Sequence, residues 1–105
     1  MMFRYDLVEE TVNLIVSEFH PERIIIFGSV ARGSATDTSD LDILVVMDSD
    51  LKPTRRAGEI YTATSDIDLA MDIIVLTPEE FEENRDNPYS FTSEIVRTGA
   101  VAYEA

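Results

Sequence analysis

An α/β fold of the α+β kind, with a small mixed β-sheet flanked by helices, is predicted by the order in which two hydrophobic patterns recur. Segments with apolar residues at helical spacing alternate with short β-branched runs of strand length. The chain has 105 residues, which is the length of one ordinary domain, and its 45% hydrophobic content is enough for one core. We therefore expect residues 1–105 to form a single domain.

The first expected element is a helix over residues 6–19. Val8, Val12 and Ile15 recur at spacings of four and three residues, which places them on one face of a helix. Pro21 ends this helix, because the residue before a proline disfavours the α conformation.

Short apolar runs predict the strands. Residues 24–27 are β-branched or aromatic and are closed by Gly28, as expected of a strand buried on both faces. A second strand is predicted over residues 40–46 and a third over residues 68–76. Residues 101–103 are expected to add a short edge strand.

The segment between the second and third strands is harder to assign. Pro53 is expected to open a helix that carries Ile60 and Tyr61 inward. Arg55 and Arg56 lie in this segment and are interpreted as charges on the helix surface.

Two helices are predicted after the third strand. Thr77, Pro78 and Glu80 have the spacing of an N-cap, a first helical residue and the partner that completes a capping box. The last helix is predicted over residues 90–97 and stops at Gly99.

The composition limits which metals and partners the chain can bind. There is no cysteine and His20 is the single histidine, so oxygen atoms must ligate any metal, which favours Mg²⁺ or Mn²⁺. The 21 acidic and 8 basic residues give a net charge of −13, which argues against direct nucleic-acid binding. Metal–nucleotide complexes and basic protein surfaces are better partners. The chain lacks a signal-peptide pattern and a membrane-spanning run, so we expect a soluble cytoplasmic protein without membrane contact.

Three aspartates are the candidate metal ligands. Asp40 and Asp42 are two residues apart in a predicted strand and project from the same face. Asp72 opens the apolar part of the next strand and can join them if the two strands are neighbours. Two carboxylates about 4 Å apart repel by about 4 kcal/mol at an effective dielectric constant near 20, so such a cluster favours a bound cation. Two alternatives stay open: unrelated aspartates at strand ends, and Asp68 in place of Asp72.

A glycine–serine loop follows the first strand. Gly28 and Ser29, with Gly33 further on, predict a tight turn whose backbone N–H groups and Ser29 hydroxyl suit a phosphate. Arg32 is a candidate phosphate contact, although a salt bridge at the turn explains it equally well. The segment lacks the Gly-Lys-Ser/Thr ending of a Walker A loop.

The combination of these motifs resembles a known family. Gly28-Ser29, ten further residues and Asp40-Leu41-Asp42 are similar to the signature of DNA polymerase β-like nucleotidyltransferases. The string 28–33 together with 39–42 resembles their minimal nucleotidyltransferase branch, and residues 72–81 are similar to its third-carboxylate strand and following helix. The resemblance implies the polymerase β-like nucleotidyltransferase fold.

The resemblance also implies roles for individual residues. Asp40, Asp42 and Asp72 would be catalytic residues that bind two Mg²⁺ ions, or Mn²⁺, and Asp72 would also take the proton of the acceptor hydroxyl. Gly28 and Ser29 would hold the triphosphate of ATP or another nucleoside triphosphate.

Members of this branch are often antitoxins paired with a toxin that has a HEPN domain. The resemblance therefore implies transfer of AMP from ATP to a hydroxyl of that protein, within a homo- or hetero-oligomer. The alternative is an antitoxin that binds its toxin stoichiometrically with little or no catalysis. A small-molecule acceptor would need an added substrate domain, and the charge of −13 disfavours RNA ends.

Overall fold

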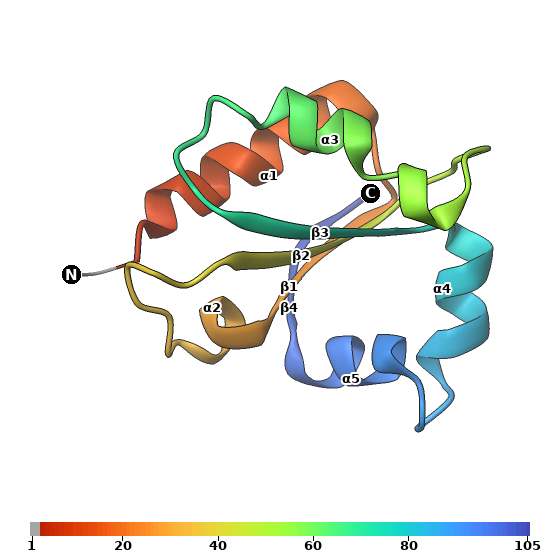
Figure 1. Ribbon diagram of the computed structural model, residues 1–105. Coiled ribbons are helices and arrows are strands. Elements are labelled where there is room, and N and C mark those ends of the chain that lie inside the picture. Colours follow the sequence, from red (N-terminus) through yellow and green to blue (C-terminus); the bar gives the residue numbers. More distant parts are fainter. Residues whose placement is uncertain (1–2) are drawn as a thin grey trace.

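The computed structural model describes residues 3–105 and confirms the mixed α+β architecture, a sheet flanked by helices (Figure 1). The helices are α1 (Tyr5–Phe19), α2 (Gly28–Arg32), α3 (Gly58–Ala63), α4 (Pro78–Arg85) and α5 (Phe91–Thr98), with a 3₁₀ turn, η1, at Pro53–Arg55. The strands are β1 (Arg23–Phe27), β2 (Leu41–Val46), β3 (Met71–Leu76) and β4 (Ala100–Glu104). None of the helices in residues 3–105 is long and apolar enough to cross a membrane.

The four strands form one sheet in the order β3-β2-β1-β4. Strand β1 pairs antiparallel with both β2 and β4, whereas β2 and β3 are parallel. Because β2 and β3 run in the same direction and in register, their first residues lie at the same end of the sheet. This pairing brings the aspartates at the starts of the two strands to one place.

Strand β1 is buried on both faces, because helices pack on the two sides of the sheet, which confirms the prediction made for this strand. Helices α1 and α3 lie on one side of the sheet, and α4 and α5 lie on the other (Figure 1). Ile24 and Ile26 join the core that includes Ile15 of α1, and Ile25 joins the core that includes Ile95 of α5. The alternation along β1 is the two-residue period of a strand.

The third strand begins later than the sequence predicts, at Met71 rather than residue 68. The preceding backbone is occupied by turns, in which the N–H of Ile67 donates to Thr64 (3.0 Å) and the N–H of Leu69 donates to Ile67 (2.8 Å). Asp68 therefore does not share the strand face of Asp72, because strand alternation does not extend through these turns.

The segment before β3 also differs in part from its prediction. Ile60 is fully buried as expected, whereas Tyr61 is 42% exposed. The Tyr61 hydroxyl instead accepts a hydrogen bond from the N–H of Ile73 (2.8 Å), so it satisfies a backbone donor of β3. The interpretation of Arg56 as a surface charge is wrong, since Arg56 is only 8% exposed and forms an ion pair with Glu80.

Glu80 forms this ion pair and also takes part in the N-terminal cap of α4. The predicted capping box is confirmed: the N–H of Glu80 donates to the Thr77 hydroxyl, and the N–H of Thr77 donates to the Glu80 carboxylate. The hydrogen bond from Arg56, followed by the one from the Thr77 backbone, lowers the pKa of Glu80 below its usual range. Arg56 also donates to the carbonyl of Leu51 (3.0 Å), so one buried guanidinium ties the segment before α3 to the start of α4.

We predict a pH-dependent loss of stability in the Glu80→Gln variant. Glutamine keeps the capping acceptor but removes the charge beside Arg56, so unfolding at pH 7 should cost about 1 kcal/mol less than in the wild type. Because the folded-state pKa of Glu80 is lowered, its contribution is present above the unfolded-state pKa of about 4.3 and is lost as pH falls through the folded-state value. Urea unfolding at pH 7 and pH 3 measures this difference, with Glu83→Gln, an exposed change on α4, as the control. If the difference in unfolding free energy between the wild type and Glu80→Gln were the same at pH 3 as at pH 7, it would not come from the charge of Glu80.

Candidate active site

The sheet brings together two of the three predicted carboxylates in neighbouring strands. Asp42 and Asp72 are register partners in the parallel pair of β2 and β3. Asp40 lies two residues before Asp42, immediately ahead of β2. The two strands are therefore neighbours, which is the condition under which Asp72 was expected to join Asp40 and Asp42.

Charge repulsion within this group is visible at Asp42. Partial burial, followed by the charges of Asp72 and Asp40, raises the pKa of Asp42 above its usual value, and Arg32 opposes the shift. Asp40 and Asp72 are exposed, so their side chains have room to turn toward a bound ion. The three carboxylates thus form one electrostatic unit, here called the aspartate cluster.

Gly28 lies directly against this cluster. Its φ of 72° is in the left-handed region, and a Cβ placed on it would lie 3.1 Å from Asp42 Cγ and closer still to Oδ2. The contact arises because Phe27, the last residue of β1, is the register partner of Asp42. The glycine–serine loop and the metal-ligand candidates, 12 residues apart along the chain from Gly28 to Asp40, therefore meet across the antiparallel pair.

The tight turn predicted at the glycine–serine loop continues directly into the short helix α2. Its N-cap residue, Phe27, has no side-chain acceptor, so this residue does not cap the first N–H groups of α2. Ser29 is half-buried, and its carbonyl accepts from the N–H of Ser34 (3.0 Å), which fixes the loop after the helix. The predicted phosphate contacts, Gly28 and Ser29, therefore lie at the first turn of α2, with Gly28 beside Asp42.

A pocket of about 250 Å³ opens over Asp42. One wall consists of Phe27, Gly28 and Arg32, so the predicted phosphate contacts and one carboxylate share a single hollow. Arg32 is exposed at this wall, and its charge interacts favourably with Asp42.

The part of the pocket lining that comes from α5 was not predicted from the sequence. Phe91, Glu94 and Thr98 of α5 line the pocket together with the buried Ile95. Their spacing of three and four residues places them on one helical face, a signal the sequence carries. The sequence does not show that this face of α5 lines the same pocket as Gly28.

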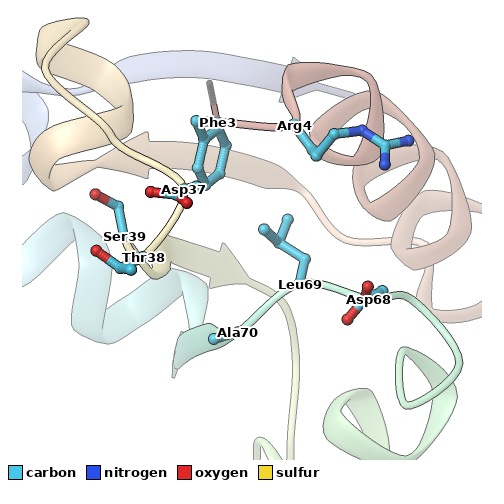
Figure 2. Close-up of a pocket in the computed structure, with 8 residues that line it drawn as sticks. All are labelled: Phe3, Arg4, Asp37, Thr38, Ser39, Asp68, Leu69 and Ala70. Carbon is cyan, nitrogen blue, oxygen red and sulfur yellow. The ribbon is translucent and has the colours of Figure 1, made fainter. Parts of the chain in front are cut away.

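Asp68, the alternative third carboxylate, lies in a different hollow. This hollow, of about 430 Å³, is bounded by the loop with Asp37 and Ser39 and by the loop with Asp68, and the side chains of Phe3 and Leu69 lie between them (Figure 2). The like charges that raise the pKa of Asp42 are Asp72 and Asp40. This arrangement favours Asp72 over Asp68 as the third member of the aspartate cluster.

The aspartate cluster offers donor atoms that suit a metal ion, but its side chains are not already arranged around one. Within residues 3–105, no three acidic or histidine side chains meet in a metal-binding geometry. The donor set nevertheless suits a hard divalent cation, since carboxylate oxygens are the ligands that Mg²⁺ prefers. The charges of Asp72 and Asp40 act on Asp42, and a divalent cation bound among the three carboxylates would offset this repulsion.

Comparison with known proteins assigns a family to this geometry. Residues 9–96 match the nucleotidyltransferase domain family. The chain belongs to the nucleotidyltransferase domain family. A protein of Methanocaldococcus jannaschii, described as a candidate protein adenylyltransferase, is 31% identical over 100 residues. The aligned region covers 91% of this chain and 94% of that protein.

Solved structures share the fold of this nucleotidyltransferase domain. The crystal structure of a candidate nucleotidyltransferase from Sulfolobus solfataricus superposes with a TM-score of 0.65 at 27% identity, over 94% of this chain and 78% of that chain. The crystal structure of a toxin–antitoxin with AMP-PNP gives a TM-score of 0.62 at 20% identity, over 92% and 73% of the two chains. At the lower identity the likeness concerns the fold alone.

Proposed function

We propose that this nucleotidyltransferase domain transfers AMP from ATP to a hydroxyl group of a protein partner. The observation that carries the proposal is the contact of Gly28 with Asp42, next to Asp72 in the register of β2 and β3. This contact joins a phosphate-binding loop to a carboxylate cluster, the two parts that nucleotidyl transfer requires. The relative described as a candidate protein adenylyltransferase supports a protein as acceptor.

The residues have separate tasks in this reaction. The first N–H groups of α2, the Ser29 hydroxyl and Arg32 hold the phosphates. Asp40, Asp42 and Asp72 would hold two Mg²⁺ ions, for which Mn²⁺ could substitute, and the bound metal would supply positive charge that offsets the charge of the triphosphate.

Asp72 takes the proton of the acceptor hydroxyl as that oxygen attacks the α-phosphorus of ATP. The bond from the acceptor oxygen to the α-phosphorus forms, the bond from the α-phosphorus to the bridging oxygen breaks, and pyrophosphate leaves. Asp72 suits this task better than Asp42 because it is exposed at the end of the sheet, where an acceptor can reach it.

The partner we propose is a basic toxin protein with a HEPN domain. The net charge of −13 favours a positively charged protein surface and would accelerate association at low salt. The structural neighbour solved as a toxin–antitoxin with AMP-PNP supports a toxin as partner and a nucleotide as ligand, and the HEPN domain proposed for the partner rests on the resemblance of the sequence motifs.

A second candidate function is neutralisation of the toxin by stoichiometric binding. The observation that favours it is the absence, within residues 3–105, of three carboxylates already arranged around one metal position. Under this alternative the acidic surface alone would hold the partner.

Isotope labelling distinguishes the reaction classes. The chain, Mg²⁺ and the protein encoded beside its gene are incubated with ATP labelled at either the α- or the γ-phosphate. Nucleotidyl transfer predicts that the partner retains the α-label and releases the γ-label as pyrophosphate. Retention of the γ-label would indicate phosphoryl transfer and contradict the proposal, and a stable unlabelled complex would favour the binding function.

A further inference from the structure

The wall that α5 contributes to the pocket is amphipathic and faces the phosphate-binding side. Phe91 and Glu94 line the same pocket as Gly28 and Arg32. The same two side chains also line a second hollow together with Arg97, so both hollows share Phe91 and Glu94. A ligand anchored by its phosphates at Gly28 therefore has Phe91 and Glu94 of α5 in the same pocket.

Phe91 contributes an aromatic ring to the lining of this pocket. It is 57% exposed, and it packs against Phe27 with the ring centroids 5.7 Å apart and the planes at 85°. This edge-to-face contact fixes the ring to the end of β1 while more than half of the residue remains accessible. Aromatic side chains held in this way are stacking platforms for nucleobases.

Glu94 lies one helical turn after Phe91 on the same face of α5. An ionised carboxylate accepts hydrogen bonds and donates none. Adenine, guanine and cytosine each carry an exocyclic amino group that can donate to it, whereas uracil has none and presents carbonyl oxygens on either side of its N–H.

We propose that the nucleobase of the donor nucleotide stacks on Phe91 and donates a hydrogen bond from its amino group to Glu94. The inference rests on the proposed function and adds to it a base-binding subsite and an order of preference. Nucleotides with amino-bearing bases bind more tightly than UTP, and ATP is among the preferred donors.

Calorimetry with two ligands separates the base from the phosphates. ATP and inorganic tripolyphosphate, each with Mg²⁺, are titrated into the wild type and into the Phe91→Ala, Phe91→Leu and Phe91→Tyr variants. We expect the alanine and leucine variants to bind ATP about tenfold more weakly, with tripolyphosphate affinity unchanged and the tyrosine variant close to wild type. Leucine retains an apolar contact with Phe27, so it separates loss of stacking from loss of packing.

UTP provides the test of Glu94. The wild type is expected to prefer ATP over UTP about tenfold, and Glu94→Gln is expected to narrow this gap, because the glutamine amide can donate to the uracil carbonyl. Equal ATP affinity in the wild type and Phe91→Ala, with both ligands bound, would overturn the base-binding subsite and leave the proposed function intact. Failure of the wild type to bind either ligand would overturn both.

Discussion

The Asp40→Ala/Asp42→Ala double variant is expected to lose at least about 10³-fold of the rate of nucleotidyl transfer. Removing both carboxylates leaves Asp72 as the remaining member of the aspartate cluster, so a divalent cation would lose most of its oxygen ligands. A loss of about 4 kcal/mol of transition-state stabilisation corresponds to this factor. The measurement is the initial rate of incorporation of α-labelled AMP into the partner protein.

The fold of the double variant should remain intact. Partial burial, followed by the charges of Asp72 and Asp40, raises the pKa of Asp42, so removing two of the three carboxylates relieves both costs and should keep or raise the midpoint of thermal unfolding. Asp68→Asn is the matched control: it removes a carboxylate in the separate hollow of Figure 2 and should leave the rate within a few-fold of wild type. A double variant that transfers AMP at the wild-type rate would exclude the aspartate cluster as the metal site.

Gly28→Ala should also inactivate the protein, by at least about 10²-fold. An alanine Cβ at this position overlaps the Asp42 carboxylate and forces it to turn away from the loop, and small displacements of reacting groups cost about this factor. The φ of 72° adds backbone strain of about 1–2 kcal/mol. Transfer rate and Mg²⁺-dependent thermal stabilisation are measured together, and both should fall.

Gly33→Ala separates strain from the steric effect. Gly33 follows α2 with a φ of 75°, but no atom lies within 4 Å of the position that its Cβ would take. The variant should therefore be destabilised to a similar degree by backbone strain while it keeps most of its transfer rate. Equal losses of activity in the two variants would show that strain in the loop, and not contact with Asp42, explains the effect.

The sequence predicted most of the fold because its local signals are strong and agree with one another. The capping box of Thr77 and Glu80 and the β-branched run at residues 24–27 each depend on contacts within a few residues or on simple burial. The cluster of Asp42 and Asp72 was a conditional prediction, since it depends on β2 and β3 being neighbours. Strand order is a property of tertiary packing that a single sequence does not encode locally.

The features that were missed depend on long-range contacts. Arg56 looks like a surface charge until Glu80, 24 residues later, is placed beside it. The start of β3 was placed too early because the turn hydrogen bonds of residues 64–69 compete with strand pairing there. The pocket wall with Phe91 required knowledge of where α5 docks on the sheet, although its helical spacing was visible.

The most direct test of the account is the intact mass of the partner protein after incubation with this chain, Mg²⁺ and ATP. We predict a mass increase of one or more AMP units with the wild type and none with the Asp40→Ala/Asp42→Ala variant. No mass increase with the wild type, together with a stable complex that forms without nucleotide, would contradict nucleotidyl transfer and leave a binding protein on a nucleotidyltransferase fold.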